Sequence, residues 1–206
     1  MFRIGQEEID AVSRVIKSKN LFKCNNGLQE TMRCENELKE IFDCKNAILM
    51  TSGKAALISA LTALGIGPGD EVIVPAYTYI ATAIAVTAVG AIPVIADIDE
   101  TLTIDVIDVE KKISKYTKAI IPVHIQGFPC NMDALLNLAA KYNLKIVEDA
   151  CQADGGSYKS KRLGTIGDAG ALSFNQFKII SAGEGGALLT NNRTLYERAF
   201  IYHDSS

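Results

Sequence analysis

Hydrophobic positions follow two different spacings along the chain. In the first part, apolar side chains recur at helical intervals with charged residues between them, as at Ile9, Val12 and Ile16. From residue 46 onward, short apolar runs alternate with helix-forming stretches, and turn residues separate them. This change of pattern predicts an N-terminal helical segment over 1–45 and an α/β domain over 46–206.

The second region alternates between strands and helices. The expected strands cover 47–50, 71–75, 92–98, 119–123, 145–147, 169–174 and 187–190, and the expected helices cover 55–64, 79–89, 105–113, 131–142 and 194–202. Asp105 and Asn131 begin two of these helices, where a side-chain oxygen can cap the first turn. Apolar strands that do not alternate are covered on both faces, so the pattern predicts a mostly parallel central sheet with helices on both faces.

In such sheets, ligands bind beyond the carboxyl ends of the strands. The turn Gly53-Lys54-Ala55 follows the first strand and opens a helix, so its free N–H groups suit a phosphate. An N-capped helix has the same sequence features without any ligand. Tyr79 follows the next strand, where an aromatic ring can stack on a flat ligand, although aromatic side chains at such turns more often belong to the core.

Two further strand ends carry ionisable residues. Glu148 and Asp149 end an apolar strand, and because consecutive residues point to opposite faces, one carboxylate can face the crevice while the other is bound elsewhere. Capping a following helix is the alternative role for Asp149. Ser173 ends a later strand, and Lys178 follows in an uncharged stretch before the run GEGG, whose backbone can approach a ligand closely. A lysine in a surface loop is the alternative there.

Together the four features fit a single ligand. It carries a phosphate for the turn at Gly53 and for Ser173, and a flat ring for Tyr79. It also offers a protonated ring nitrogen to Asp149 and a carbonyl to the amine of Lys178. Pyridoxal 5'-phosphate (PLP) has all four groups, so the strand ends predict a PLP site.

Composition narrows the function classes. The 206 residues are 48% hydrophobic and 22% charged with a net charge of -3, as in a soluble globular protein, and no Lys/Arg cluster indicates nucleic-acid binding. The acidic N-terminus lacks the features of a signal peptide, and no apolar run approaches the roughly 18 residues of a membrane span. The five cysteines form no CxxC pair and there are only two histidines, so we expect no metal site and predict free thiols in a reducing cytoplasm.

Several longer stretches resemble one known family. The likeness runs in order through TSGKAALISALTALGIGPGDEVIVPAYTYIATA, GAIPVIADID, HIQGFPCNMD, EDACQADGGSYKSKRLGTIGDAGALSF and GEGGALLT. On these residues the chain resembles the DegT/DnrJ/EryC1/StrS family of sugar aminotransferases, and within it the transaminases that aminate eight-carbon keto-sugar acids (8-amino-3,8-dideoxy-octulosonate type). The resemblance implies the large domain of the PLP-dependent transferase fold type I, with the family's C-terminal small domain missing.

The resemblance also assigns roles to residues at matching positions. Lys178 matches the lysine that forms a Schiff base with PLP and acts as general base, and Asp149 matches the aspartate on the pyridine nitrogen. Gln152 matches the glutamine near the cofactor's 3'-oxygen. Tyr79 matches the aromatic residue stacked on the ring, and Ser173 matches the serine on the phosphate.

The chain departs from the family pattern in two places. Gly53, Lys54 and Ala55 fall in the family's phosphate turn, but Lys54 stands where the family usually has threonine. Either its ammonium replaces the hydroxyl contact as a point charge, or its side chain points to solvent while the backbone binds the phosphate. The chain also ends at Ser206, before the family's small domain, so we expect either a fragment of a longer protein or a shortened relative.

The implied activity is the transfer of an amino group from an amino acid, with glutamate as the expected donor, to a keto-sugar or nucleotide-linked keto-sugar in polysaccharide or amino-sugar biosynthesis. The family implies a homodimer with the active site between its subunits. A truncated, non-catalytic or regulatory relative that binds PLP is the alternative. A P-loop is disfavoured because the first glycine of GxxxxGK[ST] is absent, and a NAD-dependent dehydrogenase because no GxGxxG follows the first strand.

Overall fold

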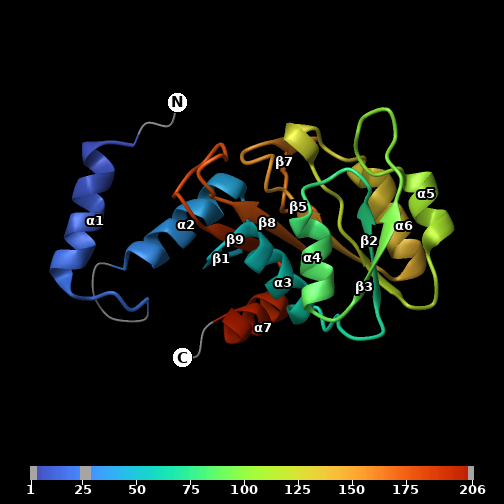
Figure 1. The fold of residues 1–206 in the computed structure, drawn as a ribbon, viewed down its shortest axis with the longest axis horizontal. Coiled ribbons are helices and arrows are strands. Elements are labelled where there is room, and N and C mark those ends of the chain that lie inside the picture. Colours follow the sequence, from blue (N-terminus) through green and yellow to red (C-terminus); the bar gives the residue numbers. More distant parts are fainter. Residues whose placement is uncertain (1–3, 24–28, 204–206) are drawn as a thin grey trace.

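The computed structural model describes residues 4–23 and 29–203, and a seven-stranded sheet forms its centre (Figure 1). In spatial order the strands are β1 (Asn46–Met50), β9 (Gly186–Thr190), β8 (Ala169–Ser173), β5 (Lys145–Asp149), β4 (Thr117–Ile120), β2 (Glu71–Pro75) and β3 (Ile92–Ala96). β9 runs antiparallel to both of its neighbours, and the pairs from β8 to β3 are parallel. The carboxyl ends of β1, β2, β5 and β8 therefore lie at the same edge of the sheet.

Helices pack against both faces of this sheet, as the sequence predicts. One face carries α3 (Gly53–Ala63), α4 (Ala81–Ala88) and α7 (Arg193–His203). The other face carries α2 (Glu30–Phe42), α5 (Val106–Lys112) and α6 (Met132–Tyr142). A short 3-10 turn, η1 (Ile125–Gly127), precedes α6. The remaining helix, α1 (Gln6–Ser18), stands apart at one end of the molecule (Figure 1).

Successive residues of the buried strands pack alternately into two apolar cores, one on each face of the sheet. Val72 and Val74 of β2 pack with the core under α3, α4 and α7, whereas Ile73 between them packs with the core under α5 and α6. In β5, Val147 and Ile146 divide in the same way. Because both faces of the sheet are covered, no polar residue interrupts the apolar runs 72–74 and 146–147. This confirms the prediction of a mostly parallel sheet with helices on both faces.

The predicted helix caps are present. The side chain of Asp105 accepts a hydrogen bond from the Ile107 N–H at 2.8 Å, and that of Asn131 accepts one from the Ala134 N–H at 3.2 Å. The boundaries differ most at β4, which ends at Ile120 and not at residue 123 as expected. Pro122 lies just beyond this end and has no N–H for a further ladder bond.

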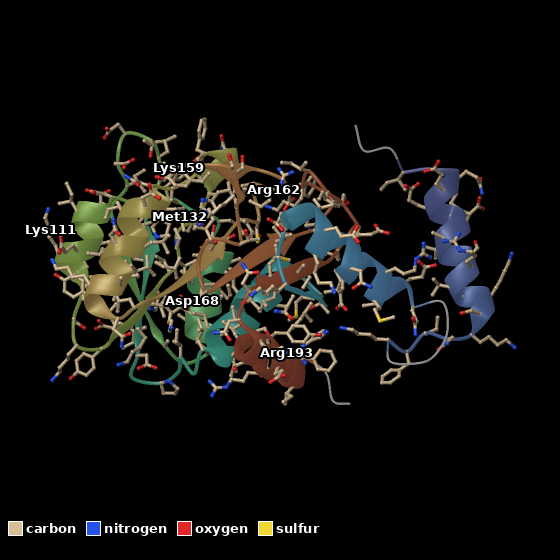
Figure 2. All side chains as sticks on the ribbon, turned by 180° about the vertical axis from the view of Figure 1, so that it is seen from behind. Lys111, Met132, Lys159, Arg162, Asp168 and Arg193 are labelled. Carbon is tan, nitrogen blue, oxygen red and sulfur yellow. The ribbon has the colours of Figure 1, made fainter. Side chains whose placement is uncertain are left out.

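The sequence analysis did not foresee a small hairpin formed by β6 (Ser157–Tyr158) and β7 (Lys161–Arg162). Its two turn residues, Lys159 and Ser160, have positive φ angles of 48° and 67°, a conformation usually taken by glycine or asparagine. Arg162 joins the hairpin to α2, because its Nε donates to the carbonyl of Ile41 at 3.2 Å (Figure 2). The hairpin thus connects the segment after β5 to α2.

The described residues before β1 include two helices, α1 and α2, in the segment whose pattern is helical. Leu38 and Phe42 of α2 are buried in the sheet's core, whereas Ile9, Val12 and Ile16 on α1 are each at least 58% exposed. The periodicity therefore predicts the helical form of α1, although its apolar stripe has no packing partner among the described residues.

The described cysteines are free thiols: Cys34, Cys44, Cys130 and Cys151. Cys24, also expected to be a free thiol, lies outside the described residues. Across residues 4–23 and 29–203, no three His, Cys, Asp or Glu side chains gather to hold a metal ion. No helix in the same part of the chain has the length and apolar character needed to cross a membrane.

Candidate functional site

A cavity of about 580 Å³ lies at the carboxyl edge of the sheet. The sequence-predicted residues that line it are Gly53, Lys54, Tyr79, Asp149, Gln152, Ser173 and Lys178. They come from the ends of β5 and β8, from segments that follow β1, β2 and β5, and from the loop between β8 and β9. Ala55, the eighth predicted residue, does not line the cavity. The sheet therefore brings together seven of the residues that the sequence proposed separately.

The turn after β1 is a capped helix start that still has free donors. Ser52 caps α3, since its Oγ accepts from the Ala55 N–H at 3.0 Å, and the first backbone bond of the helix runs from Ala56 N–H to the Ser52 carbonyl. The N–H groups of Gly53 and Lys54 precede that bond and are available to an anion. Ala55 is expected to donate its N–H to a phosphate. To do so, this N–H would have to share or break its hydrogen bond to Ser52 Oγ.

Gly53 allows this turn to approach β5 and β8 closely. A Cβ at position 53 would lie 2.5 Å from Cys151 Sγ and 2.9 Å from Ser173 Cβ, distances too short for any other residue without rearrangement. The run GEGG has a similar use, because a Cβ on Gly186 would lie 2.4 Å from the Ser52 carbonyl carbon. These glycines therefore hold the helix start beside Ser173, where both can face one phosphate.

Asp149 faces the cavity with most of its surface buried. Its Oδ2 accepts a hydrogen bond from the hydroxyl of Thr82 at 2.8 Å, and its Oδ1 accepts one from the Cys151 N–H at 3.2 Å. No helix follows Asp149, so the alternative capping role is wrong. A carboxylate offers about four acceptor positions, so two hydrogen bonds leave it able to accept a further proton donor from a ligand.

Glu148 takes the opposite role, as the alternation of β5 predicts. It is fully buried, and its oxygens accept hydrogen bonds from the N–H groups of Gly164, Ile166 and Gly167 at 2.7 to 2.9 Å. His124, also fully buried, lies 2.9 Å away through its Nε2. Glu148 thus fastens the loop before β8 to the end of β5, next to Asp149.

The His124 ring has a defined tautomer. The Cys130 backbone N–H donates to Nδ1 at 3.2 Å, so Nε2 carries the hydrogen that is donated to Glu148. The imidazole is turned away from the cavity and does not line it. His124 therefore supports the strand ends and is not available to a ligand.

Lys178 lies in the loop between β8 and β9, half-buried, at the edge of the cavity. The base of the loop is paired through backbone bonds from Phe174 N–H to Gly185 O at 2.9 Å and from Ala182 N–H to Phe174 O at 2.8 Å. The Lys178 N–H donates to the Asn175 carbonyl at 2.8 Å, which forms a turn at the lysine. These bonds fix where the lysine side chain begins, and the amine extends from a loop that is held at both ends.

Gln152 and Tyr79 differ in how firmly they are held. The side-chain oxygen of Gln152 accepts a hydrogen bond from the Gln126 N–H at 3.2 Å, which fixes its amide. Tyr79 is 69% exposed, and no described residue makes a ring contact with it. The ring is therefore accessible and not part of the core, so it can stack on a flat ligand. That stacking stays a prediction.

Thr82 is a site residue that the sequence analysis missed. It is fully buried in α4, and besides its bond to Asp149 its Oγ1 lies 2.8 Å from the hydroxyl of Thr78. The positions of Thr82 and Asp149 are 67 residues apart in the sequence, and only the parallel arrangement of β2 and β5 brings them together. The signal that could have found Thr82 is a threonine within an apolar helix that follows a strand.

We expect the change Thr82→Val to destabilise the protein by about 1 to 3 kcal/mol, because it removes a buried donor from Asp149 while keeping the shape of the side chain. Urea unfolding measures this difference. Thr87→Val is the matched control, since Thr87 lies on the same helix, is exposed, and bonds only its own helix at the Ile84 carbonyl. Equal effects of the two changes would contradict the role assigned to Thr82.

The residues present fit PLP. Asp149 keeps free acceptor positions, the half-buried amine of Lys178 lies at the same cavity, and free helix N–H groups lie beside Ser173. Burial raises the pKa of the Cys151 thiol well above its usual value, and the Asp149 carboxylate raises it further, so this cavity thiol stays neutral. The cavity therefore contains an amine, an acceptor carboxylate and anion donors in one place.

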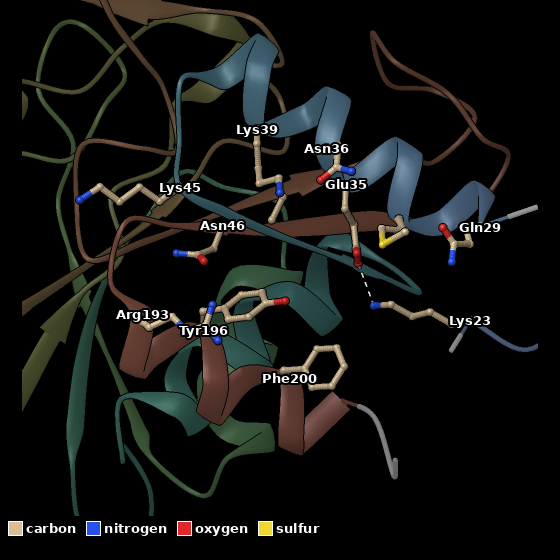
Figure 3. A pocket seen from close by; sticks show the side chains of 12 residues that line it. Lys23, Gln29, Glu35, Asn36, Lys39, Lys45, Asn46, Arg193, Tyr196 and Phe200 are labelled. Carbon is tan, nitrogen blue, oxygen red and sulfur yellow. Dashed lines mark hydrogen bonds and ion pairs between the residues drawn. The ribbon is translucent and has the colours of Figure 1, made fainter. Parts of the chain in front are cut away.

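A second cavity of about 420 Å³ lies between α2, β1 and α7 (Figure 3). The Lys23 side chain lines this cavity, and its Nζ lies 2.8 Å from Glu35 Oε1 and 5.2 Å from the centre of the Phe200 ring. None of the sequence-predicted site residues lines this cavity. Its one lining carboxylate among the described residues, Glu35, is already paired with Lys23, so it lacks the combination of groups found at the strand ends.

Comparisons with known proteins agree with the geometry. The profile of the DegT/DnrJ/EryC1/StrS aminotransferase family matches residues 3–206. The GDP-perosamine synthase of Escherichia coli O157:H7 is 46% identical over 157 residues, which are 76% of this chain and 43% of that protein. The aminotransferase from Psychrobacter cryohalolentis superposes with a TM-score of 0.91 at 43% identity, over 97% of this chain and 50% of that one.

The protein NtdA from Bacillus subtilis, solved with bound cofactor PMP, superposes with a TM-score of 0.85 at 34% identity. The match covers 97% of this chain and 45% of NtdA. The chain thus spans about half the length of the relatives that it matches.

Proposed function

The chain belongs to the DegT/DnrJ/EryC1/StrS aminotransferase family, and from this membership we propose that the protein transfers an amino group from an amino acid to a keto-sugar with PLP as cofactor. The observation that carries the proposal is the placement of Lys178 and Asp149 at one cavity with a free helix N-terminus. An amine, a carboxylate and anion donors are the three groups that this cofactor chemistry requires.

Lys178 has two tasks in this proposal. Its amine would hold the cofactor through a covalent bond, and the free amine would take the proton from the donor's α-carbon. Bound PLP supplies a ring that accepts the electrons of the broken C–H bond. The loop bonds at Phe174 and Asn175 fix where the lysine side chain begins at the edge of the cavity.

The other residues bind and orient. Asp149 accepts the hydrogen of the pyridine nitrogen and keeps it protonated, with Thr82 and the Cys151 N–H fixing the carboxylate. Ser173 and the N–H groups of Gly53 and Lys54 bind the phosphate. Gln152 would lie by the 3'-oxygen, and Tyr79 would cover the ring face.

The names of the relatives suggest the wider role. Several are enzymes of amino-sugar formation, such as GDP-perosamine synthase and dTDP-3-amino-3,4,6-trideoxy-alpha-D-glucose transaminase. We infer a keto-sugar or nucleotide-linked keto-sugar as acceptor, glutamate as donor, and a cytoplasmic homodimer as the working form.

We expect Lys54→Ala to weaken PLP binding about tenfold, because the change removes a charge-assisted contact to the phosphate. Lys54 is exposed and lines the cavity, so its ammonium can reach an anion at the helix start. Titration of the protein with PLP measures the affinity. Lys45→Ala is the control, since Lys45 lines the other cavity. Unchanged affinity in Lys54→Ala would mean that the backbone alone binds the phosphate.

A protein that binds PLP without catalysis is the second candidate. A visible absorbance band after addition of PLP, lost on borohydride treatment, supports covalent binding at the lysine. Conversion of a keto-sugar in the presence of glutamate then separates an aminotransferase from a protein that only binds the cofactor. A protein that stays colourless with PLP would contradict both candidates.

A further inference from the structure

Asp154 is a buried carboxylate without a partner. It is only 8% exposed, and neither of its side-chain oxygens accepts a hydrogen bond from any described residue. A buried, unpaired acid of this kind costs free energy, and most proteins avoid it unless the group has a use. Asp154 is not among the residues that line the cavity, and neither the sequence analysis nor the proposed mechanism gives it a role.

The surroundings of Asp154 connect it to the lysine loop. It follows β5 in the turn that also carries Cys151 and Gln152, and the loop between β8 and β9 packs near it. The positive charge of Lys178 and the backbone N–H of Ile180, both from that loop, favour its ionised form. The Cys151 thiol, in the same turn as Asp154, is a further titratable group that interacts with it.

Burial dominates the balance at this carboxylate. It raises the pKa of Asp154 from 3.8 to about 7, even though the Ile180 N–H and the Lys178 charge act in the opposite direction. Near neutral pH Asp154 is therefore about half ionised, and a cation that came closer than Lys178 does in this structure would favour its charged form.

Lys178 is also without an ion pair. None of the salt bridges within residues 4–23 and 29–203 includes it. The charge of the Lys178 amine, on the loop between β8 and β9, acts on the unpaired Asp154 carboxylate, on the segment after β5. A flexible four-carbon stem lets a lysine amine move several ångströms without moving its backbone.

We propose that Asp154 is a positioning residue for Lys178, and that its carboxylate binds the Lys178 ammonium whenever this amine is not bonded to the cofactor. The proposal rests on the proposed function, in which the lysine is alternately bonded and free. Asp154 then gives the free ammonium a second, defined position beneath the loop. When the amine returns to the cavity, Asp154 takes up a proton and remains buried as a neutral acid.

A double-mutant cycle on the cofactor-free chain tests this pairing. The four proteins are the unaltered chain, Asp154→Asn, Lys178→Met and the double variant, and urea unfolding at pH 8 gives the equilibrium constant of each. We expect Lys178→Met to raise the unfolding constant about tenfold when Asp154 is present and less than about twofold in the Asp154→Asn background. The same factor in both backgrounds would overturn the proposal.

The dependence of this coupling on pH separates an ion pair from a packing effect. Since Asp154 is protonated well below its pKa of about 7, the coupling should disappear when the pH is lowered from 8 to 5. A coupling that persists at pH 5 would contradict the ion pair. Lys54→Met serves as the matched control, because Lys54 is a second lysine of the cavity and should show no coupling with Asp154 at either pH.

Two further points keep the test decisive. If Lys178→Met does not fold, Lys178→Gln removes the same charge with a polar side chain and replaces it in the cycle. Because the cycle uses no cofactor, its outcome is independent of whether PLP binds. Failure of the proposed function would appear separately, as the absence of a covalent PLP adduct on the unaltered chain.

Discussion

Replacing Lys178 with alanine is expected to abolish covalent attachment of PLP and to lower the rate of amino-group transfer by about a thousandfold or more. The expected loss is large because one amine serves both as the covalent anchor and as the group that moves the proton, and general acid–base catalysis alone contributes roughly 10² to 10⁴. The absorbance of the PLP-treated protein and the initial rate of keto-sugar amination measure the two losses.

Lys54→Ala is the control for this change, because Lys54 is the other lysine that lines the cavity. It should keep the covalent adduct, even where its affinity for PLP is lower. Addition of a small primary amine should restore part of the rate to Lys178→Ala, since the amine can supply the missing base. An alanine variant that still forms a borohydride-stable adduct at the site would show that another lysine is the anchor.

Replacing Asp149 with alanine is the second large effect, with an expected loss of about 10² to 10³ in rate. Without the carboxylate the pyridine nitrogen loses its acceptor, and the ring stabilises the electrons of the broken C–H bond less well. Asp149→Asn keeps the shape and the contact to Thr82 but cannot stabilise a positive charge, so it should lose most of the same rate. Steady-state rates at saturating PLP measure both variants.

The comparison with Asp149→Asn separates charge from packing. If Asn restored the rate, the hydrogen bonds to Thr82 and Cys151 would matter and the charge would not. An undiminished rate in Asp149→Ala would contradict the role of Asp149 altogether. Thr82→Val should show a smaller loss than either variant, since it acts only through the position of the carboxylate.

The sequence predicted those parts of the fold that depend on local pattern. Apolar runs located the strands, and Asp105 and Asn131 marked two helix starts because capping involves residues only two or three positions away. The alternation at Glu148 and Asp149 also predicted one buried and one cavity-facing carboxylate. Neighbours in sequence determine all of these features.

The missed features depend on contacts between distant segments. Thr82 reads as one more small residue of an apolar helix, and its bond to Asp149 exists only once β2 and β5 share a sheet. Asp154 reads as an ordinary turn residue before two glycines, and the charge of Lys178 acts on it from a loop that is distant in sequence. The hairpin at Lys159 and Ser160 lacks the usual glycine or asparagine, so no local signal marked it.

The central claim is that Lys178 is the residue that binds PLP, and mapping the site of attachment tests it most directly. The protein is incubated with PLP, reduced with borohydride and digested, and mass spectrometry locates the modified lysine. We expect one predominant modification, in the peptide that contains Lys178. Modification spread over surface lysines, or concentrated at Lys54, with Lys178 unmodified, would contradict the account.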